Sequence, residues 1–301
     1  MSRTRTLITL FLAAALLAAC MASFAYNRLD WLIPWWVDGY VDLTHDQRQL
    51  LKEQLAPTLE WHREEELAHY IELLDRIEAG LPGPVDAAWV KERIDEMLQA
   101  ARRVEDQMIS VALDFGATIS DEQIQEFLDA LRKQQEEYER DAAELSDEEY
   151  AEDDYENLAS VMKRFLGRLT PEQKATLHDA ASQLQRFDRA WLEDRKRWLA
   201  SVEPMLQREP GWQQAIKDAH ATRRENRTPE YTARFNHNLG VVTQATADVL
   251  NAMSERQLKH AEKEIGKIRK KIQKLIDDRR GGMQADNAVS LPCSRLRLLQ
   301  G

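Results

Sequence analysis

Stripes of apolar residues at alternating steps of three and four constrain the fold of this chain more than any other feature. The first stripe has no gap: Val90, Ile94, Met97, Ala101, Val104, Met108, Val111 and Phe115. A repeat that averages 3.5 residues places every member on one side of an α-helix, as in bundles and coiled coils. The pattern therefore predicts a long amphipathic helix with one buried side.

Two similar stripes follow at residues 177–202 and 258–275, and a further apolar side begins at Tyr231. The stripe at 177–202 predicts one continuous helix. The chain is 31% charged and has only 11 glycines and 9 prolines, a composition that suits helices with solvated sides. No segment shows the alternation of a strand. We predict an all-α fold, an elongated bundle of long amphipathic helices without a sheet.

A recurring element marks four expected helix starts. Each copy has an apolar residue, then Thr or Ser, two further residues and Gln. In a capping box, the hydroxyl accepts a hydrogen bond from a free backbone N–H and the Gln side chain reaches back to the cap residue. Pro171 supports the third copy. The predicted cap pairs are Thr44 with Gln47, Ser120 with Gln123, Thr170 with Gln173, and Ser254 with Gln257. Their unequal spacing indicates no fixed repeat.

The N-terminus has the features of a bacterial lipoprotein signal. Basic residues precede a short apolar segment at residues 7–19, which is too short to span the ~30 Å hydrocarbon core of a bilayer. Leu17-Ala18-Ala19-Cys20 resembles the lipobox, in which a lipid is attached to the cysteine. We therefore predict a signal peptide at 1–19 and lipidation of Cys20. Met21 in place of aspartate resembles the signal for outer-membrane delivery.

Residues 20–43 join the expected lipid to an aromatic collar. It includes Trp31, Trp35 and Trp36, and Pro34 is expected to prevent a helix across it. We expect these tryptophans to close one end of the bundle, because large aromatics are mostly buried. The alternative is contact with lipid headgroups or a partner. Asp38 and Asp42 lie among the aromatics and are candidates for the same partner or membrane contact, although local turn and cap bonding is the favoured role.

The remaining chain divides into a helical domain at 44–280 and a tail at 281–301. Breaks are expected at residues 81–84 and 209–211, and Pro204 is expected to end a helix. The tail is polar and lacks periodicity, so we predict disorder there. Cys293, the second cysteine, lies in this tail, and no disulfide framework is expected.

The charge distribution excludes nucleic acid as a partner. The net charge is −11, and a periplasmic location would remove the protein from nucleic acid altogether. An acidic stretch at 136–156 is expected to be a solvated, partly frayed helix, with cation binding as the alternative. A basic stretch at 259–274 could lie against anionic lipid or pair with the acidic stretch.

One cluster qualifies as a candidate metal site. His62, Glu66 and His69 have the spacing i, i+4, i+7 on an expected helix, and two histidines with a carboxylate can bind zinc. The segment lacks the H-E-x-x-H order and a general base in register. We therefore favour a solvated or hydrogen-bonded cluster, and predict no metal, no cofactor and no catalytic residue.

Two resemblances add to this interpretation. The run FAYNRLDWLIPWWVDGYVDLT, with residues 47 and 60–67, resembles a family of proteobacterial lipoproteins known only as a domain of unknown function. That resemblance implies an all-helical periplasmic lipoprotein and no activity. The Leu-Thr-x-x-Gln elements at 43–47 and 169–173, with looser copies at 119–123 and 253–257, are similar to the paired motifs of the Spy/CpxP periplasmic chaperones. Helix capping alone also accounts for those elements.

The expected function is a non-catalytic, lipid-anchored binding or chaperone-like protein on the periplasmic side of the outer membrane. It would present an apolar groove between helices to a polypeptide client or an envelope protein. The alternatives are a structural envelope lipoprotein and a metal-dependent enzyme that uses His62, Glu66 and His69. The inner membrane is the less favoured location.

Overall fold

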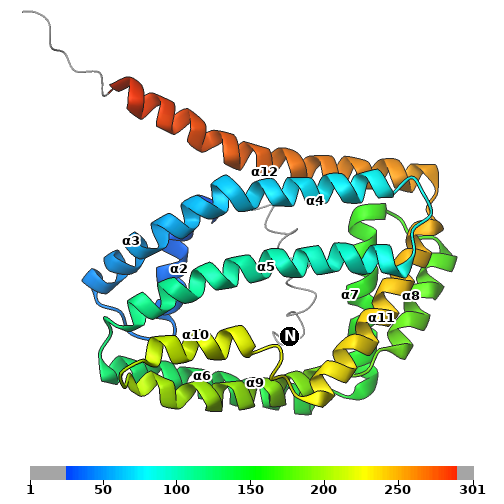
Figure 1. Cartoon of the computed structure of the whole chain (residues 1–301). Coiled ribbons are helices and arrows are strands. Elements are labelled where there is room, and N and C mark those ends of the chain that lie inside the picture. The colour runs from blue at the N-terminus through cyan, green and yellow to red at the C-terminus, as the bar shows by residue number, and fades with distance from the viewer. Residues whose placement is uncertain (1–24, 290–301) are drawn as a thin grey trace, which may run out of the picture.

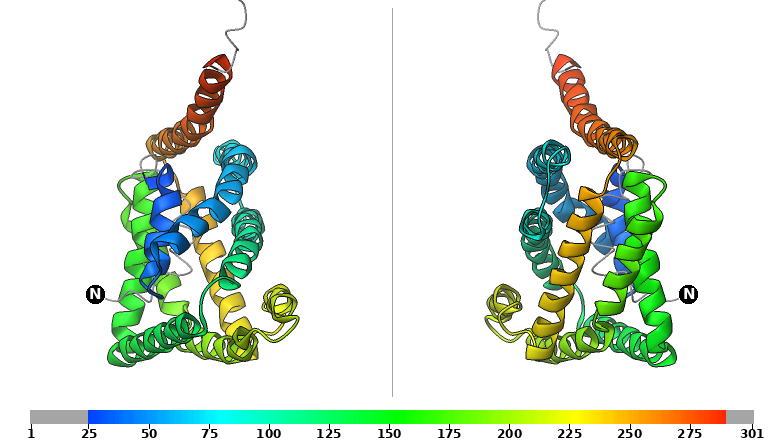
Figure 2. Two further views of the ribbon diagram at one scale, coloured as in Figure 1. Left: turned by 90° about the vertical axis from the view of Figure 1, so that its left-hand side faces the viewer. Right: turned by 90° about the vertical axis from the view of Figure 1, so that its right-hand side faces the viewer.

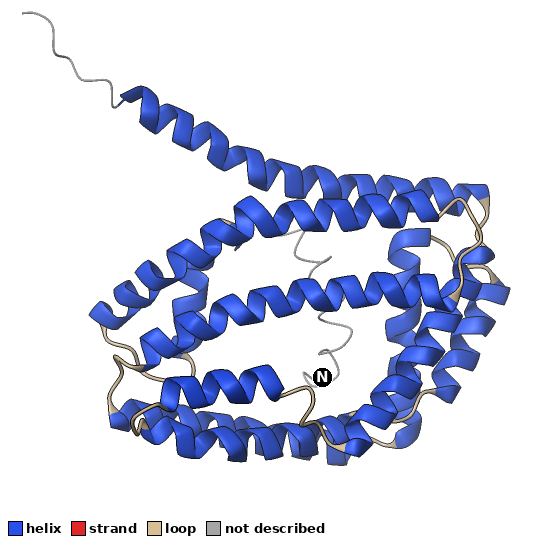
Figure 3. Ribbon diagram, viewed as in Figure 1, coloured by secondary structure: helices blue, strands red, loops and turns tan. Residues whose placement is uncertain are grey.

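The computed structural model describes residues 25–289 and contains only helices and loops in that range, as Figure 3 shows. The all-α prediction is therefore confirmed for the described residues. The elements are α2 (Leu29–Asp38), α3 (His45–Trp61), a π-helical turn (His62–Glu66), α4 (Leu67–Gly80), α5 (Ala87–Gly116), α6 (Asp121–Glu144), α7 (Asp147–Leu166), α8 (Pro171–Gln183), α9 (Asp188–Val202), a 3₁₀ turn (Glu203–Gln207), α10 (Trp212–Thr222), α11 (Pro229–Asn251) and α12 (Glu255–Val289).

The helices outline an elongated frame (Figure 1). The α4 and α12 helices run together along one long side, and α6 and α9 form the other. One short end contains α7, α8 and α11, and α2 lies at the opposite end beside α3. The α5 helix runs lengthwise between the two long sides and packs on α3, α4 and α11. Figure 2 shows α5 and α7 on opposite sides of the frame.

The buried side chains form separate clusters at the places where helices meet. The largest cluster joins α4, α7, α8, α11 and α12, and contains Leu177 and Val249. A second cluster joins α3, α5 and the start of α6 around Leu55. Two smaller ones connect α5 to α11 and to α9 and α10. Each helix with a single apolar side buries that side at these contacts.

All four predicted capping boxes are present, and their glutamines meet in pairs. The Nε2 of Gln47 and of Gln123 each donates to the other's Oε1 at 2.8 Å. Gln257 Nε2 donates to Gln173 Oε1 at 2.8 Å, and Gln173 Nε2 donates back at 3.3 Å. We call these pairs the first and second glutamine clasps. Each clasp holds two helix starts together: α3 with α6, and α8 with α12.

The clasps explain why these boxes carry Gln rather than Glu. Each Oε1 accepts from the N–H of its own cap residue, and each amide group donates to the opposite box. Two glutamates would satisfy the caps, but they could not donate, and their charges would repel. Ser146 forms a fifth box, at the start of α7, and it uses Glu149.

Replacing Gln173 by glutamate should weaken the second glutamine clasp and leave the capping box intact. Glutamate keeps the capping box and still accepts from Gln257 Nε2, but at a position 1% exposed it can no longer donate to Gln257 Oε1 or to the Val249 and Ala252 carbonyls. We expect about 3 kcal/mol of destabilisation, because a buried, charged carboxylate oxygen would face these oxygen atoms without a hydrogen. The matched Gln47→Glu change, in the more exposed first clasp, should cost about 1 kcal/mol. Urea unfolding followed by circular dichroism measures both, and equal losses would contradict the role of the clasp.

The continuous helix predicted across 177–202 is wrong, because the chain is non-helical at residues 184–187 between α8 and α9. Tertiary hydrogen bonds occupy the backbone there. The N–H of Gln185 donates to Asn238 Oδ1 at 2.8 Å, and the Asn238 amide donates to the Gln185 carbonyl at 2.7 Å. These bonds replace the helical ones. Periodicity did not reveal the break, because the apolar phase continues across it.

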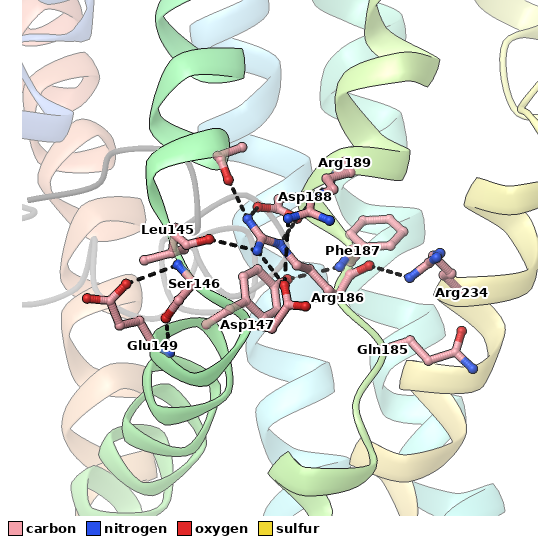
Figure 4. Close-up of polar contacts among 12 residues, drawn as sticks. Leu145, Ser146, Asp147, Glu149, Gln185, Arg186, Phe187, Asp188, Arg189 and Arg234 are labelled. Atoms are coloured by element: carbon pink, nitrogen blue, oxygen red, sulfur yellow. Dashed lines mark hydrogen bonds and ion pairs between the residues drawn. The ribbon is translucent and has the colours of Figure 1, made fainter.

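Arg186, at the centre of this break, ties the end of α6 to the starts of α7 and α9 (Figure 4). Its guanidinium donates to the carbonyls of Ala142 and Leu145, to Asp147 Oδ1 at 2.6 Å, and to both oxygens of Asp188 at 2.9 Å. The hydrogen bonds with Asp188 hold the pKa of Arg186 above its usual range despite burial. No motif in the sequence marks Arg186.

The acidic stretch at 136–156 is not one frayed helix, because it is divided between α6 and α7. Ser146 accepts from the N–H of Glu149 at 3.1 Å and begins α7. The pattern Leu145-Ser146-Asp147-Glu148-Glu149 is a capping box that sequence alone could have identified. In the basic stretch, Arg269 pairs with Asp75 and Glu78 of α4. The α12 helix also packs on α7.

Two further boundaries differ from expectation. The α2 helix contains Pro34, which is buried, so this proline does not prevent a helix. Pro34 is at the sixth of ten positions, and packing on α3 compensates for the missing hydrogen bond. The α12 helix continues to Val289, past the expected tail start at residue 281, and residues 290–301 lie outside the described range. Within the described residues, no helix is both long and apolar enough to cross a membrane.

Candidate functional site

The π-helical turn at residues 62–66 interrupts an otherwise continuous helix formed by α3 and α4. Such turns hold a wider backbone and often occur at functional sites. The turn also changes the register of the side chains that follow it. His62 and Glu66, which a regular helix would stack on one side, therefore project toward different neighbours. This turn and its side-chain contacts are the candidate site.

Glu66 is completely buried and is held by a single arginine from α5. Arg103 Nε donates to Glu66 Oε2 and Arg103 Nη2 donates to Oε1, both at 2.7 Å. This two-point geometry is the strongest arrangement of an arginine and a carboxylate. His69 Nδ1 lies 3.6 Å from Glu66 Oε2, but its side chain is half exposed. The carboxylate of Glu66 is therefore occupied on both oxygens.

His62 lies between two tyrosine hydroxyls. Its Nδ1 is 2.9 Å from the Tyr26 hydroxyl and its Nε2 is 3.2 Å from the Tyr70 hydroxyl. A neutral imidazole has one donor and one acceptor, so one tyrosine donates to the ring and the other accepts from it. Burial lowers the pKa of His62, which favours this neutral form.

Both tyrosines remain protonated at neutral pH. Burial raises the pKa of Tyr26 to about 12, although the Arg63 guanidinium beside it acts in the opposite direction. Burial raises the pKa of Tyr70 further, and the charge of Glu66 adds to that effect. Neither hydroxyl is therefore an activated nucleophile, and neither is a base.

Arg63 connects the turn to both ends of the described chain. Its Nη2 donates to Asn27 Oδ1 at 2.8 Å, its Nη1 donates to the Leu275 carbonyl of α12 at 2.8 Å, and its guanidinium lies 4.8 Å from the centroid of the Tyr26 ring. The segment just before α2 is thus fastened to α3, α4 and α12 at one point.

The predicted three-residue metal candidate is not assembled as a ligand set. Arg103 holds Glu66, the tyrosines hold His62, and only His69 lies near the carboxylate. Within the described range, no group of three or more His, Cys, Asp or Glu side chains is placed to hold a metal ion. A cavity of about 130 Å³ lies beside the site, between α4 and α5, and is lined by His69, Tyr70, Glu72, Leu73, Arg76, Glu96, Gln99, Ala100 and Arg103.

A comparison with protein-family models matches residues 39–232, more than half of the chain, to a family of unknown function, DUF6279. The chain is a member of DUF6279. The resemblance to an uncharacterised family is thereby confirmed. A search of curated proteins and a search of solved structures each found no match.

The region matched to DUF6279 contains the π-helical turn and Arg103, and it begins after Trp31, Trp35 and Trp36. The run that resembles the family starts at Phe24, so most of its aromatic part precedes the match. Glu66 and Arg103 both lie inside the matched region, and the tryptophans lie before it.

The prediction that the tryptophans close one end of the bundle is wrong, because all three are exposed. Trp31, Trp35 and Trp36 have exposed fractions of 59%, 61% and 59%, and they are the exposed large apolar side chains of the described chain. Trp31 and Trp35 stack with ring centroids 6.3 Å apart. The α2 helix instead packs through Ile33, Pro34 and Val37.

The two candidate aspartates of this segment have different roles. Asp38 accepts from the backbone N–H of Leu43 at 3.1 Å and from Arg48 Nη1 at 2.6 Å, so the expected turn bonding is confirmed. Asp42 contributes its backbone, since its carbonyl accepts from Gln123 Nε2 at 2.7 Å. Cys20, the predicted lipidation site, lies outside the described residues.

Proposed function

We propose that this protein is a non-catalytic, lipid-anchored binding protein with a chaperone-like role on the periplasmic face of the outer membrane. The lipobox-like sequence before Cys20 supports the anchor, and the exposed tryptophans of α2 support binding. In the candidate site, Glu66 is engaged by Arg103, and His62 is engaged by Tyr26 and Tyr70. A lipid on Cys20 would hold the frame at the membrane surface.

One observation carries this proposal: the exposed tryptophans of α2. Soluble proteins rarely expose neighbouring large aromatic side chains without a partner. Tryptophan favours the interface between water and lipid, where its ring meets apolar chains and its N–H remains hydrated. Cys20 precedes the first described residue, Ala25, by five residues, which span at most about 18 Å even when extended. A lipid on Cys20 and the tryptophan side of α2 can therefore contact one membrane surface.

The same side of α2 is the apolar surface on which a polypeptide client could bind. An apolar groove between helices, as expected from the sequence, would require exposed large apolar side chains on more than one helix. Among the described residues, the exposed large apolar side chains are Trp31, Trp35 and Trp36, and all three belong to α2. A client and the membrane would then compete for α2. A structural lipoprotein would use this surface for lipid alone.

Changing the anchor and the tryptophans separately tests the proposal. The Cys20→Ala variant should lose fatty-acid labelling and move to the soluble periplasmic fraction. The variant Trp31→Ser/Trp35→Ser/Trp36→Ser should keep its label, but its affinity for lipid vesicles should fall on the order of tenfold for each tryptophan. A Trp→Leu triple variant preserves much of the apolar area and is the matched control for interfacial preference.

Two results would contradict the proposal. Cys20→Ala could fractionate with the outer membrane as the wild type does, which would exclude the lipid as the anchor. The wild-type protein could also fail to suppress aggregation of an unfolded client at near-stoichiometric ratios, which would leave a structural lipoprotein. Vesicles that abolish suppression would place client and lipid on the same side of α2.

A further inference from the structure

A group of arginines lacks matching carboxylates near the turn between α10 and α11. Arg223, Arg224 and Arg227 lie in this turn, and Arg195 faces it from α9. Arg224 pairs with Glu105 at 3.1 Å. Arg195 donates to the neutral amides of Gln134 and Gln135. In a chain of net charge −11, this local excess of positive charge is unusual.

Arg223 and Arg227 each lie on an aromatic ring rather than beside an acid. The Arg223 guanidinium carbon is 4.3 Å from the centroid of Trp198, and that of Arg227 is 4.3 Å from the centroid of Tyr231. Stacking fixes the plane of each guanidinium. Among the described residues, neither one has a carboxylate within ion-pair distance.

Three acids near this turn are already engaged, and a fourth, Glu225, lies exposed in the turn itself. Asp194, which is buried, accepts from the backbone N–H of Thr228 at 2.9 Å and so caps the entry to α11. Asp106 lies 3.1 Å from His220, and Glu105 pairs with Arg224. Burial and the neighbouring charge of Arg227 both lower the pKa of Arg223, while Glu105 and Asp194 oppose that shift only in part.

The same cluster contains hydrogen-bond donors without acceptors. The Nε atoms of Arg223 and Arg227 and the Nε1 of Trp198 are buried and have no partner among the described residues. Buried polar groups normally have hydrogen-bond partners. Within the described part of the chain, these three donors lack acceptor atoms, and the two arginines lack a paired negative charge. Both arginine side chains remain partly exposed, so an anion can reach them from solvent.

We propose that Arg223 and Arg227 form a binding site for a phosphate group. Two oriented guanidiniums present forked donors, a geometry that matches the oxygens of a phosphate. The ligand would supply negative charge at this turn, and its oxygens would accept from the Nη groups, since the Nε atoms are buried. The group could come from free phosphate or from a phosphorylated lipid headgroup. The site does not depend on the lipid on Cys20 or on the tryptophans of α2.

Calorimetry with inorganic phosphate on the full-length protein tests the site. The wild type should bind, and Arg223→Gln/Arg227→Gln should lose affinity on the order of tenfold or more, because two charge-assisted contacts are removed. The control Arg132→Gln/Arg189→Gln removes the same charge from two half-exposed arginines that already have acid partners, and should bind as the wild type does. Lysine at 223 and 227 keeps the charge and should bind more weakly than arginine.

Vesicles distinguish the source of the phosphate. Stronger binding to phosphatidic-acid vesicles than to phosphatidylcholine vesicles, with the difference lost in Arg223→Gln/Arg227→Gln, would identify a lipid headgroup. Saturation by inorganic phosphate alone would identify a soluble ligand. The proposal is overturned if the wild type binds neither probe, or if both double variants lose the same affinity. Phosphate should also raise the Tm of the wild type and of the Arg132→Gln/Arg189→Gln control, but not that of Arg223→Gln/Arg227→Gln. This pattern would show that the loss of phosphate binding is not caused by misfolding.

Discussion

Replacing Arg186 by alanine should lower the free energy of unfolding by about 3–5 kcal/mol, because removing one partner leaves the other charge buried and uncompensated. The side chains of Arg186 and Asp188 are each 9% exposed. Without Arg186, the Asp188 carboxylate loses its two-point partner, and the carbonyls of Ala142 and Leu145 lose a donor. The junction of α6, α7, α8 and α9 should open first.

The neighbouring Arg189 provides the control. It is 63% exposed and lies 3.7 Å from the same Asp147 carboxylate. Arg189→Ala should change stability by less than about 1 kcal/mol, as exposed ion pairs do. Guanidinium-chloride unfolding followed by circular dichroism measures both variants. Similar midpoints for Arg186→Ala and Arg189→Ala would show that the junction does not depend on Arg186.

Replacing Arg103 by alanine should cost about 3 kcal/mol or more, since Glu66 would remain buried without its partner. The change Glu66→Gln should cost less, because the Arg103 side chain is 40% exposed and can turn toward water. The double variant Glu66→Leu/Arg103→Leu should be more stable than Arg103→Ala, because no buried charge is left. The order of the three unfolding free energies is the expected result.

The control for Arg103→Ala is Lys91→Ala. This change removes an exposed ion pair with Asp95 on the same helix as Arg103, and it should have little effect on stability. Fluorescence from the tryptophans of α2 should change in Arg103→Ala if the turn fastens α2 to the frame through Tyr26 and Arg63. If Arg103→Ala and Lys91→Ala are equally stable, the buried pair has no structural role.

The local features of this fold were predictable because residues close in sequence produce them. Each capping box involves residues three apart, and each stripe repeats within one helix. The break at 81–84 and the 3₁₀ turn from Glu203 were likewise signalled by proline and glycine. Ser146 begins a fifth capping box, which the four predicted boxes do not include because it carries Glu149 in place of Gln.

The candidate site could be predicted only in part. His62, Glu66 and His69 were identified as a cluster, but their partners Tyr26 and Arg103 lie 36 and 37 residues away from the residues they hold. The spacing i, i+4, i+7 places these side chains on one side of a regular helix, and the π-helical turn changes the directions in which they project. Arg186, Arg223 and Arg227 carry no motif, so their surroundings became visible only in the structure.

The sequence by itself determined the helical class, the four helix starts that carry a Gln capping box, and which sides of the helices are polar. These follow from periodicity and capping, which act over one or two turns. Tertiary structure alone decided which glutamines form clasps, where α8 ends, and which side of α2 carries exposed tryptophan. Each of these depends on contacts between distant segments, whose energies no local pattern records. A side chain is buried only when another helix covers it, and three tryptophans on α2 have no such cover in the described chain.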